Sequence, residues 1–411
     1  MRNKLIAVFA AAAVITALVL VPGVVSTSFG DTASKETIKI GFLSSLSGPF
    51  AMLTRYSSPA VHMVIDNANA SGGLFGKQLQ LITRDDQGDP SVVAEKLTEL
   101  KGEGCIAIIG PFMGANGRPA NQWASTNNVP LVTCASPSLA DRVHTNKYTF
   151  FTIPVQNAVA EVLYRGMLTR PLKSFYYLGS DIVNAHEMYD YIADKMKKNH
   201  PEIVNLGSVW PSISNVEFSN LISAALAKKP DVVISGQAGP GWAALCQQGM
   251  KFNLFKRARV VGSYALESAV TASFGKNYPE GVETTDWCPF WEQSKAMQDY
   301  LKAHLAVSKV YPADKGFELH LAALAVVAAM RKAGSAEPDA VANALENLSF
   351  DSPVGAVHFN DYDHQLKIPI WYATSGYSKE FPIAIGVHSI KYGDDVYPSK
   401  EEILALRAAS K

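Results

Sequence analysis

Short apolar stretches rich in β-branched residues alternate along the chain with longer stretches in which apolar residues recur every three or four positions. Residues 37–43 form one of the short stretches, and residues 59–70 place Val61, Val64 and Ile65 on one helical face. The same criteria predict further strands at 78–83, 106–109, 131–133, 174–178, 203–210, 232–235 and 259–262, and further helices at 91–102, 118–127, 186–199, 218–228 and 240–250. This alternation predicts an α/β protein built from βαβ units with parallel sheets.

The predicted strands and helices fall into two blocks, residues 37–153 and 174–282. Each block has the pattern of a doubly wound domain, and 411 residues suffice for two or three domains. Antiparallel strands are predicted near the end of the chain, between residues 357 and 387. Between these regions, helices are predicted at 294–304, 315–332 and 339–348. We therefore expect two α/β domains, with the later helices covering one of the sheets.

The first thirty residues have the order of a secretory signal peptide. Arg2 and Lys4 precede an apolar run over residues 5–21, and small residues follow Pro22. We expect residues 1–30 to be removed on export and the mature protein to be exported and soluble. An uncleaved anchor is the alternative, because the apolar run is a little long; a lipid anchor is not expected, because no Cys lies near the junction. No later stretch is long and apolar enough to span a bilayer.

Charge and cysteine content narrow the class of protein further. The 37 Lys and Arg residues balance 37 Asp and Glu residues, so the basic excess of a nucleic-acid-binding protein is missing. The four cysteines could form disulfides after export in three alternative pairings, but we expect mostly free and buried thiols. They are Cys105, Cys134, Cys246 and Cys288. The sequence thus predicts a soluble exported protein with no nucleic-acid partner.

Three loops at the carboxyl ends of predicted strands carry the candidate binding chemistry. Residues 44–48, 110–115 and 134–138 are rich in Gly, Ser and Pro and contain no acidic or basic side chain. In doubly wound sheets ligands bind at these strand ends, where the backbone N–H groups of helix N-termini favour a carboxylate. The alternative is that Gly and Ser only build the turns between strands and helices.

The sequence does not meet the templates for catalysis or metal binding. It has no G-x-S-x-G elbow, no P-loop and no H-E-x-x-H motif. His62, His186 and His320 are scattered over predicted helices without a partner at ligand spacing. Asp85 and Asp86 could form a paired-carboxylate site, but a turn at the end of a strand accounts for them better. We therefore expect no enzyme activity, no metal site and no cofactor.

Two further features could belong to a binding site. The segment 287–291 brings three large aromatic rings together, either in a ligand pocket or as packing between the domains. Arg55 and Arg118 could each pair with a ligand carboxylate or could remain solvated. The pattern alone leaves both questions open.

Six segments of the chain carry motifs that occur together in one known family. They are residues 38–51, 66–77, 84–90, 109–111, 128–130 and 230–233. In this order and spacing they resemble the branched-chain amino-acid-binding (Leu/Ile/Val-binding) family of type I periplasmic solute-binding proteins of ABC importers. The resemblance implies two doubly wound lobes joined by a three-strand hinge, a ligand between the lobes, and no catalytic activity or cofactor. It also implies ABC permease subunits in the inner membrane as partners of a monomeric receptor.

The resemblance further implies that each lobe is discontinuous in sequence. Lobe 1 is expected to contain residues 36–154 and 286–362, and lobe 2 residues 155–285 and 363–411. The helices after residue 291 would then return to lobe 1. The three crossings between the lobes would form a hinge that closes on the ligand.

The family's ligand-binding positions can be transferred to this chain one residue at a time. Those that hold the ligand carboxylate fall on two strand ends of lobe 1, and the acidic position that meets a ligand ammonium falls near Tyr264, three residues before Glu267. The implied site is lined by Leu53, Gly114, Ala115, Ala135, Ser136, Pro137, Asn184, Ala238 and Tyr264.

Several of these residues depart from the family's pattern. Tyr264 stands where the acid is expected, and two positions that are Tyr in the family fall near Asn184 and Ala238. A buried ammonium without an acidic partner is costly. We therefore expect a small carboxylate as ligand, either a hydrophobic amino acid or, preferably, an aromatic or organic acid without an α-amino group. Short amides or urea are alternative ligands, and a ligand-binding sensor component or an exported hydrolase is the alternative role.

Overall fold

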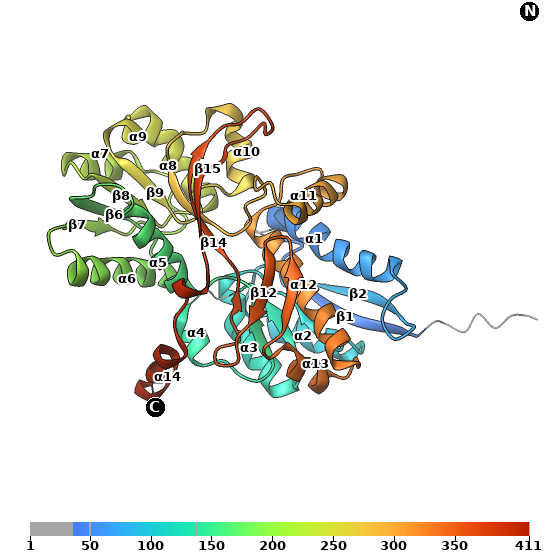
Figure 1. The fold of residues 1–411 in the computed structure, drawn as a ribbon. Helices are drawn as coiled ribbons and strands as arrows, with labels where there is room; N and C mark the ends of the chain where they lie inside the picture. Colours follow the sequence, from blue (N-terminus) through green and yellow to red (C-terminus); the bar gives the residue numbers. More distant parts are fainter. Residues whose placement is uncertain (1–35, 49–50, 136–137, 411) are drawn as a thin grey trace, which may run out of the picture. The chain divides into compact units, whose positions relative to one another are not determined.

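The computed structural model describes residues 36–48, 51–135 and 138–410 (Figure 1). The predicted signal peptide, residues 1–30, lies outside these residues, as do Ser136 and Pro137 of the predicted site. Within the described ranges, no helix combines the length and the apolar character that crossing a bilayer requires.

The first predicted block forms a five-stranded sheet in which all strands are parallel. The strand order is β2-β1-β3-β4-β5, so the chain starts inside the sheet and winds outward in both directions. The strands are β1 (Thr37–Ser44), β2 (Gln78–Asp85), β3 (Ile108–Ile109), β4 (Leu131–Thr133) and β5 (Thr149–Phe151). This arrangement confirms the doubly wound sheet predicted for the block.

Helices from two distant parts of the chain accompany this sheet, and we call the sheet and these helices lobe 1. Four of them follow its strands: α1 (Ala51–Ala70), α2 (Val93–Gly102), α3 (Gly114–Asn127) and α4 (Leu139–Val143). Three come from later in the sequence: α11 (Lys295–Ser308), α12 (Asp314–Ala333) and α13 (Pro338–Leu345). Helix α12 packs along α1 and contacts β3 and β4, which Figure 1 shows as orange and blue elements side by side.

The second sheet has seven strands in the order β15-β14-β10-β9-β8-β6-β7, and we call this sheet and its helices lobe 2. The strands are β6 (Ser174–Leu178), β7 (Val204–Val209), β8 (Val232–Ser235), β9 (Arg259–Gly262), β10 (Glu283–Asp286), β14 (Ile370–Gly376) and β15 (Ile385–Tyr392). Strands β6 to β10 are parallel, whereas β14 and β15 are antiparallel, as the sequence predicted for the end of the chain. The helices are α5 (Gln156–Met167), α6 (Val183–Asn199), α7 (Ser219–Ala227), α8 (Gly239–Lys251), α9 (Leu254–Arg257), α10 (Ser268–Phe274) and the short 3₁₀ helix η1 (Gly275–Asn277).

A small antiparallel sheet and a C-terminal helix complete the described chain. They consist of β11 (Ser349–Ser352), β12 (Gly355–Phe359), β13 (Leu366–Lys367), η2 (Asp394–Val396) and α14 (Lys400–Ala409). Arg407 of α14 donates to the carbonyl oxygens of Val143 at 2.7 Å and Arg142 at 3.3 Å, so the C-terminal helix contacts lobe 1. The residue-by-residue lobe boundaries given above remain a prediction.

Helix α1 begins at Ala51, eight residues before the predicted start, and runs through Pro59. Proline is unfavourable inside a helix, because it removes a backbone N–H. Close packing on α12 offsets that cost: a Cβ added at Gly316 would lie 2.5 Å from the carbonyl oxygen of Tyr56. Tertiary contact thus overrides the local signal. Helix α3 likewise begins at Gly114, four residues before its predicted start at residue 118.

A buried arginine joins the segments by which the chain passes between the lobes. Arg142 of α4 is fully buried, and its guanidinium lies 3.7 Å from the ring centroid of Phe151 at the end of β5. It donates to Gln365 Oε1 at 2.9 Å and to the carbonyl oxygen of Ile153 at 3.2 Å. Gln365 in turn donates to the same carbonyl at 3.0 Å. Two segments that run from lobe 1 to lobe 2, at Ile153 and at Gln365, are therefore held by one side chain.

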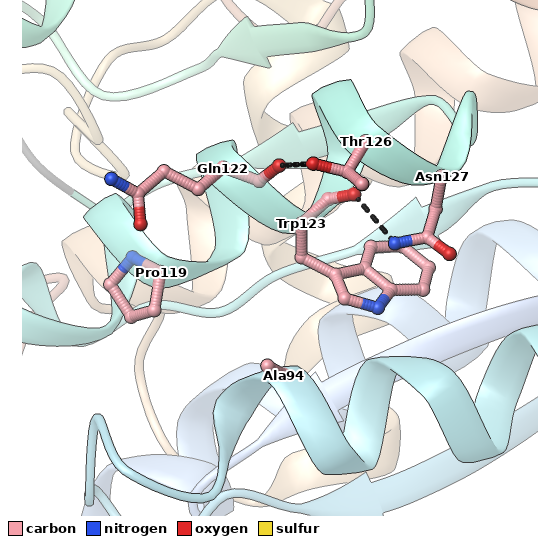
Figure 2. A pocket seen from close by; sticks show the side chains of 6 residues that line it. All are labelled: Ala94, Pro119, Gln122, Trp123, Thr126 and Asn127. Carbon is pink, nitrogen blue, oxygen red and sulfur yellow. Dashed lines mark hydrogen bonds between the residues drawn. The ribbon is translucent and has the colours of Figure 1, made fainter.

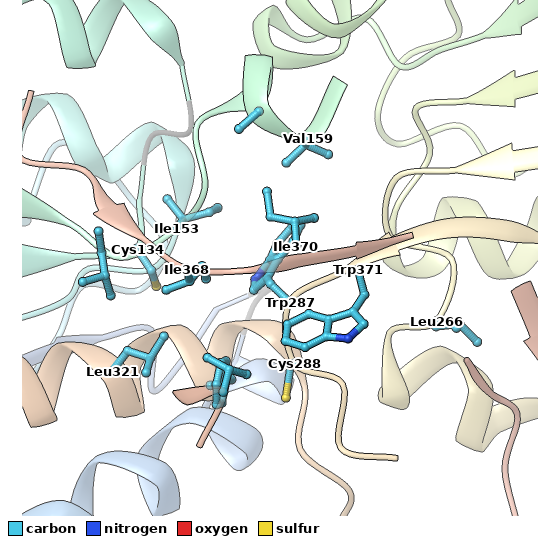
Figure 3. Packing of buried hydrophobic residues seen from close by; sticks show 14 of the residues in the cluster. Cys134, Ile153, Val159, Leu266, Trp287, Cys288, Leu321, Ile368, Ile370 and Trp371 are labelled. Atoms are coloured by element: carbon cyan, nitrogen blue, oxygen red, sulfur yellow. The ribbon is translucent and has the colours of Figure 1, made fainter. Parts of the chain in front are cut away.

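The buried core continues through the junction of the two lobes. Figure 3 shows Cys134 and Ile153 from the end of the first sheet, with Trp287 and Ile370 from the second, as members of one buried cluster. All four cysteines are buried and unpaired with one another, which confirms the expectation of free thiols.

Candidate functional site

The acidic pair at the end of β2 shapes the loop that follows β1. Asp85 Oδ1 accepts the backbone N–H groups of Leu46 at 2.8 Å and Ser47 at 3.2 Å, and Asp86 Oδ1 accepts the hydroxyl of Ser45 at 2.5 Å. Partial burial raises the pKa of Asp85, but bonds from Ser47 and from neighbouring backbone N–H groups outweigh it and hold the pKa below its ordinary value. The pair is a structural turn, as the sequence favoured.

The loop after β3 leads to an accessible helix N-terminus. Gly110 has φ = 93°, and a Cβ there would clash with the carbonyl oxygen of Leu43 in β1, so only glycine fits. Gly114 and Ala115 open α3, and both are exposed. Asn116 follows; it is fully buried, and its side-chain amide has no hydrogen-bond partner among the described residues. The predicted carboxylate position is therefore open to solvent.

The first residues after β4 belong to the packed interior of lobe 1. Cys134 and Ala135 are fully buried, and the N–H of Ala135 donates to Thr133 Oγ1 at 3.0 Å. The Thr133 hydroxyl in turn donates to the carbonyl oxygen of Pro111 at 2.8 Å. Ala135 therefore belongs to the packed floor of the predicted site.

Lobe 1 adds a charged cluster beside this strand end. Lys315, in the first turn of α12, places Nζ 2.9 Å from Glu318 Oε2 and 3.4 Å from the carbonyl oxygen of Cys134. Glu318 is fully buried, and its Oε1 accepts the indole N–H of Trp287 at 2.9 Å. Sequence reasoning missed both charged residues of α12, although a basic residue at the start of the predicted helix 315–332 was a signal that could have found them.

Lobe 2 contributes Tyr264 and Glu267 to the same cluster. The ring of Tyr264, which follows β9, meets Trp287 edge-on with centroids 5.5 Å apart. Burial raises the pKa of the Tyr264 hydroxyl, and the charge of Lys315 opposes that rise. Glu267 is the residue before α10 and is only partly exposed; burial raises its pKa, while Lys315 lowers it. An acidic side chain therefore stands beside Tyr264, where the alignment found none.

Carboxyl groups outnumber basic groups in this cluster. Besides Glu267, burial raises the pKa of Glu318 and Asp314 above their ordinary values, and it raises the pKa of Asp286 to about 8. Asp286 ends β10 of lobe 2 and Asp314 opens α12 of lobe 1. Because the proximity of Asp286 raises the pKa of Asp314 further, the two lobes place these two carboxyl groups close together.

Two more predicted residues lie on lobe 2 at contacts with this region. Asn184 is the second residue of α6, and one turn later Glu187 accepts the Ser138 hydroxyl of lobe 1 at 2.7 Å. Ala238 is exposed and precedes α8, whose first residue, Gly239, hydrogen-bonds through its backbone to Glu267 and lowers the pKa of that carboxyl. The hydrogen bond between Glu187 and Ser138 thus joins the two lobes near Asn184.

The remaining candidates from lobe 1 are Leu53, Arg55 and Arg118. Leu53 is partly buried in α1 and packs against the main core. Arg55 is exposed, and the side chain of Arg118 is 74% exposed with its Nε 4.0 Å from Asp141. The arginine side chains therefore remain solvated, which is the alternative that the sequence left open.

The aromatic segment 287–291 is buried between the lobes. Phe290 lies 5.3 Å from the ring of Tyr311 and 5.6 Å from that of Phe381, between centroids. Trp291 packs against Gly386 of β15. Of the three rings, only Trp287 reaches the charged cluster, so packing between the lobes explains most of this segment.

A shallow surface hollow lies elsewhere on lobe 1, between α2 and α3 (Figure 2). Its volume is about 250 Å³. It is lined by Ala94, Pro119, Gln122, Trp123, Thr126 and Asn127, none of which follows a strand end. Among the described residues no charged side chain lines the hollow, and it is not the site that the sequence predicted.

The arrangement at the strand ends suits binding rather than reaction. Within the described residues, no three His, Cys, Asp or Glu side chains are grouped so that they could hold a metal ion. Burial raises the pKa of the Cys134 thiol well above its ordinary value, so this thiol is a poor nucleophile. An exposed helix N-terminus, one lysine and several carboxyl groups can instead hold a small polar ligand.

Sequence comparisons connect this arrangement with solute-binding proteins. A family model described as periplasmic binding protein matches residues 37–377. A Leu/Ile/Val-binding protein of Rhizobium johnstonii is 27% identical over 351 residues, which cover 82% of this chain and 91% of the relative. A leucine-, isoleucine-, valine-, threonine- and alanine-binding protein of Pseudomonas aeruginosa is 24% identical over 338 residues, covering 79% of this chain and 86% of the relative. These findings confirm the resemblance to the branched-chain amino-acid-binding family.

Structure comparison gives the same fold. A solute-binding protein of an ABC transporter from Rhodopseudomonas palustris, solved in complex with 3,4-dihydroxybenzoic acid, matches with a TM-score of 0.79 at 16% identity. The match covers 87% of this chain and 97% of that one. The relatives named here are binding proteins and not enzymes, which confirms the prediction that the chain is not an enzyme.

Proposed function

Because the chain belongs to the periplasmic binding protein family and has its type I two-lobed fold, we propose that it is the solute receptor of an ABC importer. It binds a small carboxylate in the cleft between the lobes and delivers it to permease subunits in the inner membrane. The receptor acts in the periplasm as a monomer, after removal of residues 1–30.

One observation supports this role more than any other: strand ends of both lobes meet in a single polar cluster. Contacts run without a break from Tyr264 of lobe 2 through Trp287, Glu318 and Lys315 to Cys134 of lobe 1. A ligand in contact with both ends of this series would favour the state in which the lobes are together. That coupling is what a receptor needs in order to report its loaded state to a permease.

The proposed pocket combines the transferred positions with the charged cluster. It is lined by Leu53, Gly114, Ala115, Ala135, Ser136, Pro137, Asn184, Ala238 and Tyr264, together with Glu267 and Lys315. The exposed N-terminus of α3 suits a carboxylate, because the helix dipole favours negative charge there. The relatives' ligands fit this chemistry, since branched-chain amino acids and 3,4-dihydroxybenzoic acid all carry a carboxylate.

A thermal-shift screen of the purified mature protein tests the proposal. The compounds are hydrophobic amino acids, aromatic acids, dicarboxylates, short amides and urea. A ligand at about 100 times its dissociation constant stabilises the folded protein by about 2.7 kcal/mol, which is easily measured. A response to carboxylates supports the proposal, and a response to amides or urea alone favours the alternative ligands. No response in any class would contradict a receptor for small solutes.

Glu267 changes the expectation for the ligand's amino group. The preference for acids without an α-amino group rested on Tyr264 standing at the aligned acidic position, but Glu267 lies in the same cluster. We expect an amino acid to bind about tenfold or more tightly than its 2-keto analogue, because Glu267 offers the ammonium an acidic partner. Calorimetry with leucine and with phenylalanine, each against its keto acid, measures the ratio.

A single substitution controls this prediction. Glu267→Gln keeps the size of the side chain and removes its charge, so the preference for the amino acid should fall to about one. Equal binding of both members of each pair by the unmodified protein would contradict a role for Glu267, and tighter binding of the keto acids would restore the original preference for acids that lack an amine.

Ala115 offers a direct test of the pocket's position. Ala135 is fully buried, so a bulky residue there would strain the core as well as fill the site. Ala115 is exposed at the start of α3, and Ala115→Trp should lower ligand affinity by about 100-fold or more with little loss of stability. Ala303→Trp, at an exposed position of α11 in the same lobe, is the matched control. Unchanged affinity in the Ala115 variant would place the pocket elsewhere.

A further inference from the structure

Lys315 lies at the N-terminal end of its helix, where a positive charge is not expected to stabilise the fold. Helix α12 runs over Asp314–Ala333, so Lys315 is its second residue. The N-terminus of a helix carries a partial positive charge, which disfavours a lysine in the first turn. Positions at which a local preference is broken without a local benefit are expected at functional sites.

The ammonium group of Lys315 is held in place but not fully used. It donates to Glu318 Oε2 at 2.9 Å and to the carbonyl oxygen of Cys134 at 3.4 Å. A lysine ammonium has three N–H donors. Across the described ranges of the chain the third donor has no hydrogen-bond acceptor, and the side chain keeps 25% of its surface exposed. A group that approaches from the cleft can therefore still reach this nitrogen.

Glu318 orients the lysine rather than competing with a ligand. Its carboxylate is fully buried between Lys315 and the indole N–H of Trp287, which donates to Oε1 at 2.9 Å. Both oxygens of Glu318 are therefore occupied, and the carboxylate is fixed in position. The lysine ammonium is held by this anchor.

Lys315 also faces the other lobe. Its charge lowers the pKa of Glu267 and opposes the rise in the pKa of Tyr264, both in the segment that follows β9. Burial lowers the pKa of Lys315 itself, but the neighbouring carboxylate of Glu318 and other groups outweigh burial, so the net shift is upward and the lysine stays charged. Lys315 is the basic side chain whose charge acts most strongly on Tyr264, Glu267 and Glu318.

We propose that Lys315 contacts the ligand and selects for an anionic group, donating its third N–H to the ligand's carboxylate beside the strand end at Cys134. This inference rests on the proposed receptor function. The inference makes one side chain responsible for the preference for carboxylates over uncharged analogues. Backbone N–H groups at the start of α3 carry no full charge and would provide only part of this preference. An ion-paired hydrogen bond is roughly twice as strong as a neutral one.

The test compares carboxylates with their uncharged amides in calorimetry. The pairs are leucine with leucinamide and benzoate with benzamide, measured on the full mature protein. The unmodified protein should prefer the carboxylate of the pair that it binds by about 100-fold or more. The double variant Lys315→Met with Glu318→Gln removes both members of the ion pair, so Glu318 is not left as a buried charge without its partner, and the preference should fall by about tenfold or more.

Three controls separate ligand contact from structural support. Lys315→Arg keeps the charge and should keep most of the preference. Glu318→Gln alone keeps the lysine and should also keep it. Lys332→Met, near the other end of α12, removes a lysine that donates only to backbone carbonyls and should change nothing. The melting temperature without ligand shows whether each variant is folded.

The outcomes distinguish this inference from the proposed function. If the unmodified protein binds carboxylates and the folded double variant keeps the full preference, Lys315 is only the charge partner of Glu318, and the inference is wrong. If the unmodified protein binds neither carboxylates nor amides, the receptor function fails and the inference fails with it. Loss of the preference in the double variant, with Lys315→Arg retaining it, supports the proposal.

Discussion

Replacing Arg142 by methionine should lower the free energy of unfolding by about 3 kcal/mol or more. The guanidinium is fully buried and donates to Gln365 and to the carbonyl oxygen of Ile153, which belong to two segments that pass between the lobes. Burial lowers the pKa of Arg142 to about 10, so the group is still charged at neutral pH, and its hydrogen bonds are charge-assisted. The substitution leaves buried acceptors unpaired and removes the cation from the ring of Phe151.

Urea titration followed by circular dichroism measures this effect. Arg118→Met is the matched control, because Arg118 is 74% exposed and its loss should change the stability by less than about 0.5 kcal/mol. Arg142→Lys keeps the charge but not the planar fork, and it should fall between the two. An Arg142→Met protein as stable as the Arg118 variant would mean that the segments between the lobes are held by backbone packing alone.

The alternation of strands and helices could be predicted because its signal is local. A buried strand such as β8, Val232–Ser235, needs only a short β-branched run, and its neighbours follow from the βαβ rule. Helix starts were predicted less well. Helix α3 begins after Met113, whose side chain accepts no capping bond, so no residue type marks its true start at Gly114. The first turns of α1 were also not predicted, because Pro59 is unfavourable inside a helix. The packing that makes Pro59 tolerable involves Gly316, which is far away in the sequence.

The candidate site, too, could be predicted from the sequence only in part. The strand ends at Gly114 and Ala135 could be found from the local pattern, because parallel strands present their carboxyl ends on one edge. Lys315 and Cys134 are 181 residues apart in sequence, and only the folded chain brings them to 3.4 Å. Whether Tyr264 or Glu267 takes the acidic position stays a prediction, because a distant resemblance cannot fix the register of the loop after β9. A charged side chain that acts across the lobes leaves little trace in the sequence beyond its unusual place in a helix.

The second large effect is expected on acidification. His304 is fully buried in α11, and neither ring nitrogen has a hydrogen-bond partner in the described part of the chain. His320 of α12 is also buried, with Nδ1 2.9 Å from the carbonyl oxygen of Ala60. The ring of Tyr300 lies between them, with centroids 5.7 Å from His304 and 4.7 Å from His320. Burial lowers the pKa of each imidazole to about 4, and the proximity of His320 contributes to the shift at His304.

The sign of the pH dependence follows from these values. In the unfolded chain a histidine has a pKa of about 6.5. Between about pH 6.5 and pH 4 the unfolded state therefore binds more protons than the folded state, so stability is complete above this window and is lost as the pH falls through it. At 1.36 kcal/mol per pKa unit, each histidine should cost about 3 kcal/mol by pH 4. The buried carboxyl groups with raised pKa contribute with the opposite sign, because protonation at low pH suits their burial.

A histidine variant isolates this term from the carboxyl groups. His304→Leu removes the buried imidazole and keeps an apolar side chain, so the variant should gain about 2 kcal/mol or more relative to the unmodified protein between about pH 7.5 and pH 4.5. Urea titrations at these two pH values give the difference directly. His62→Leu, at an exposed position of α1, should leave the difference near zero. If both variants lose stability in parallel with the unmodified protein, His304 is protonated in the folded state, and its surroundings must admit water that can carry the charge.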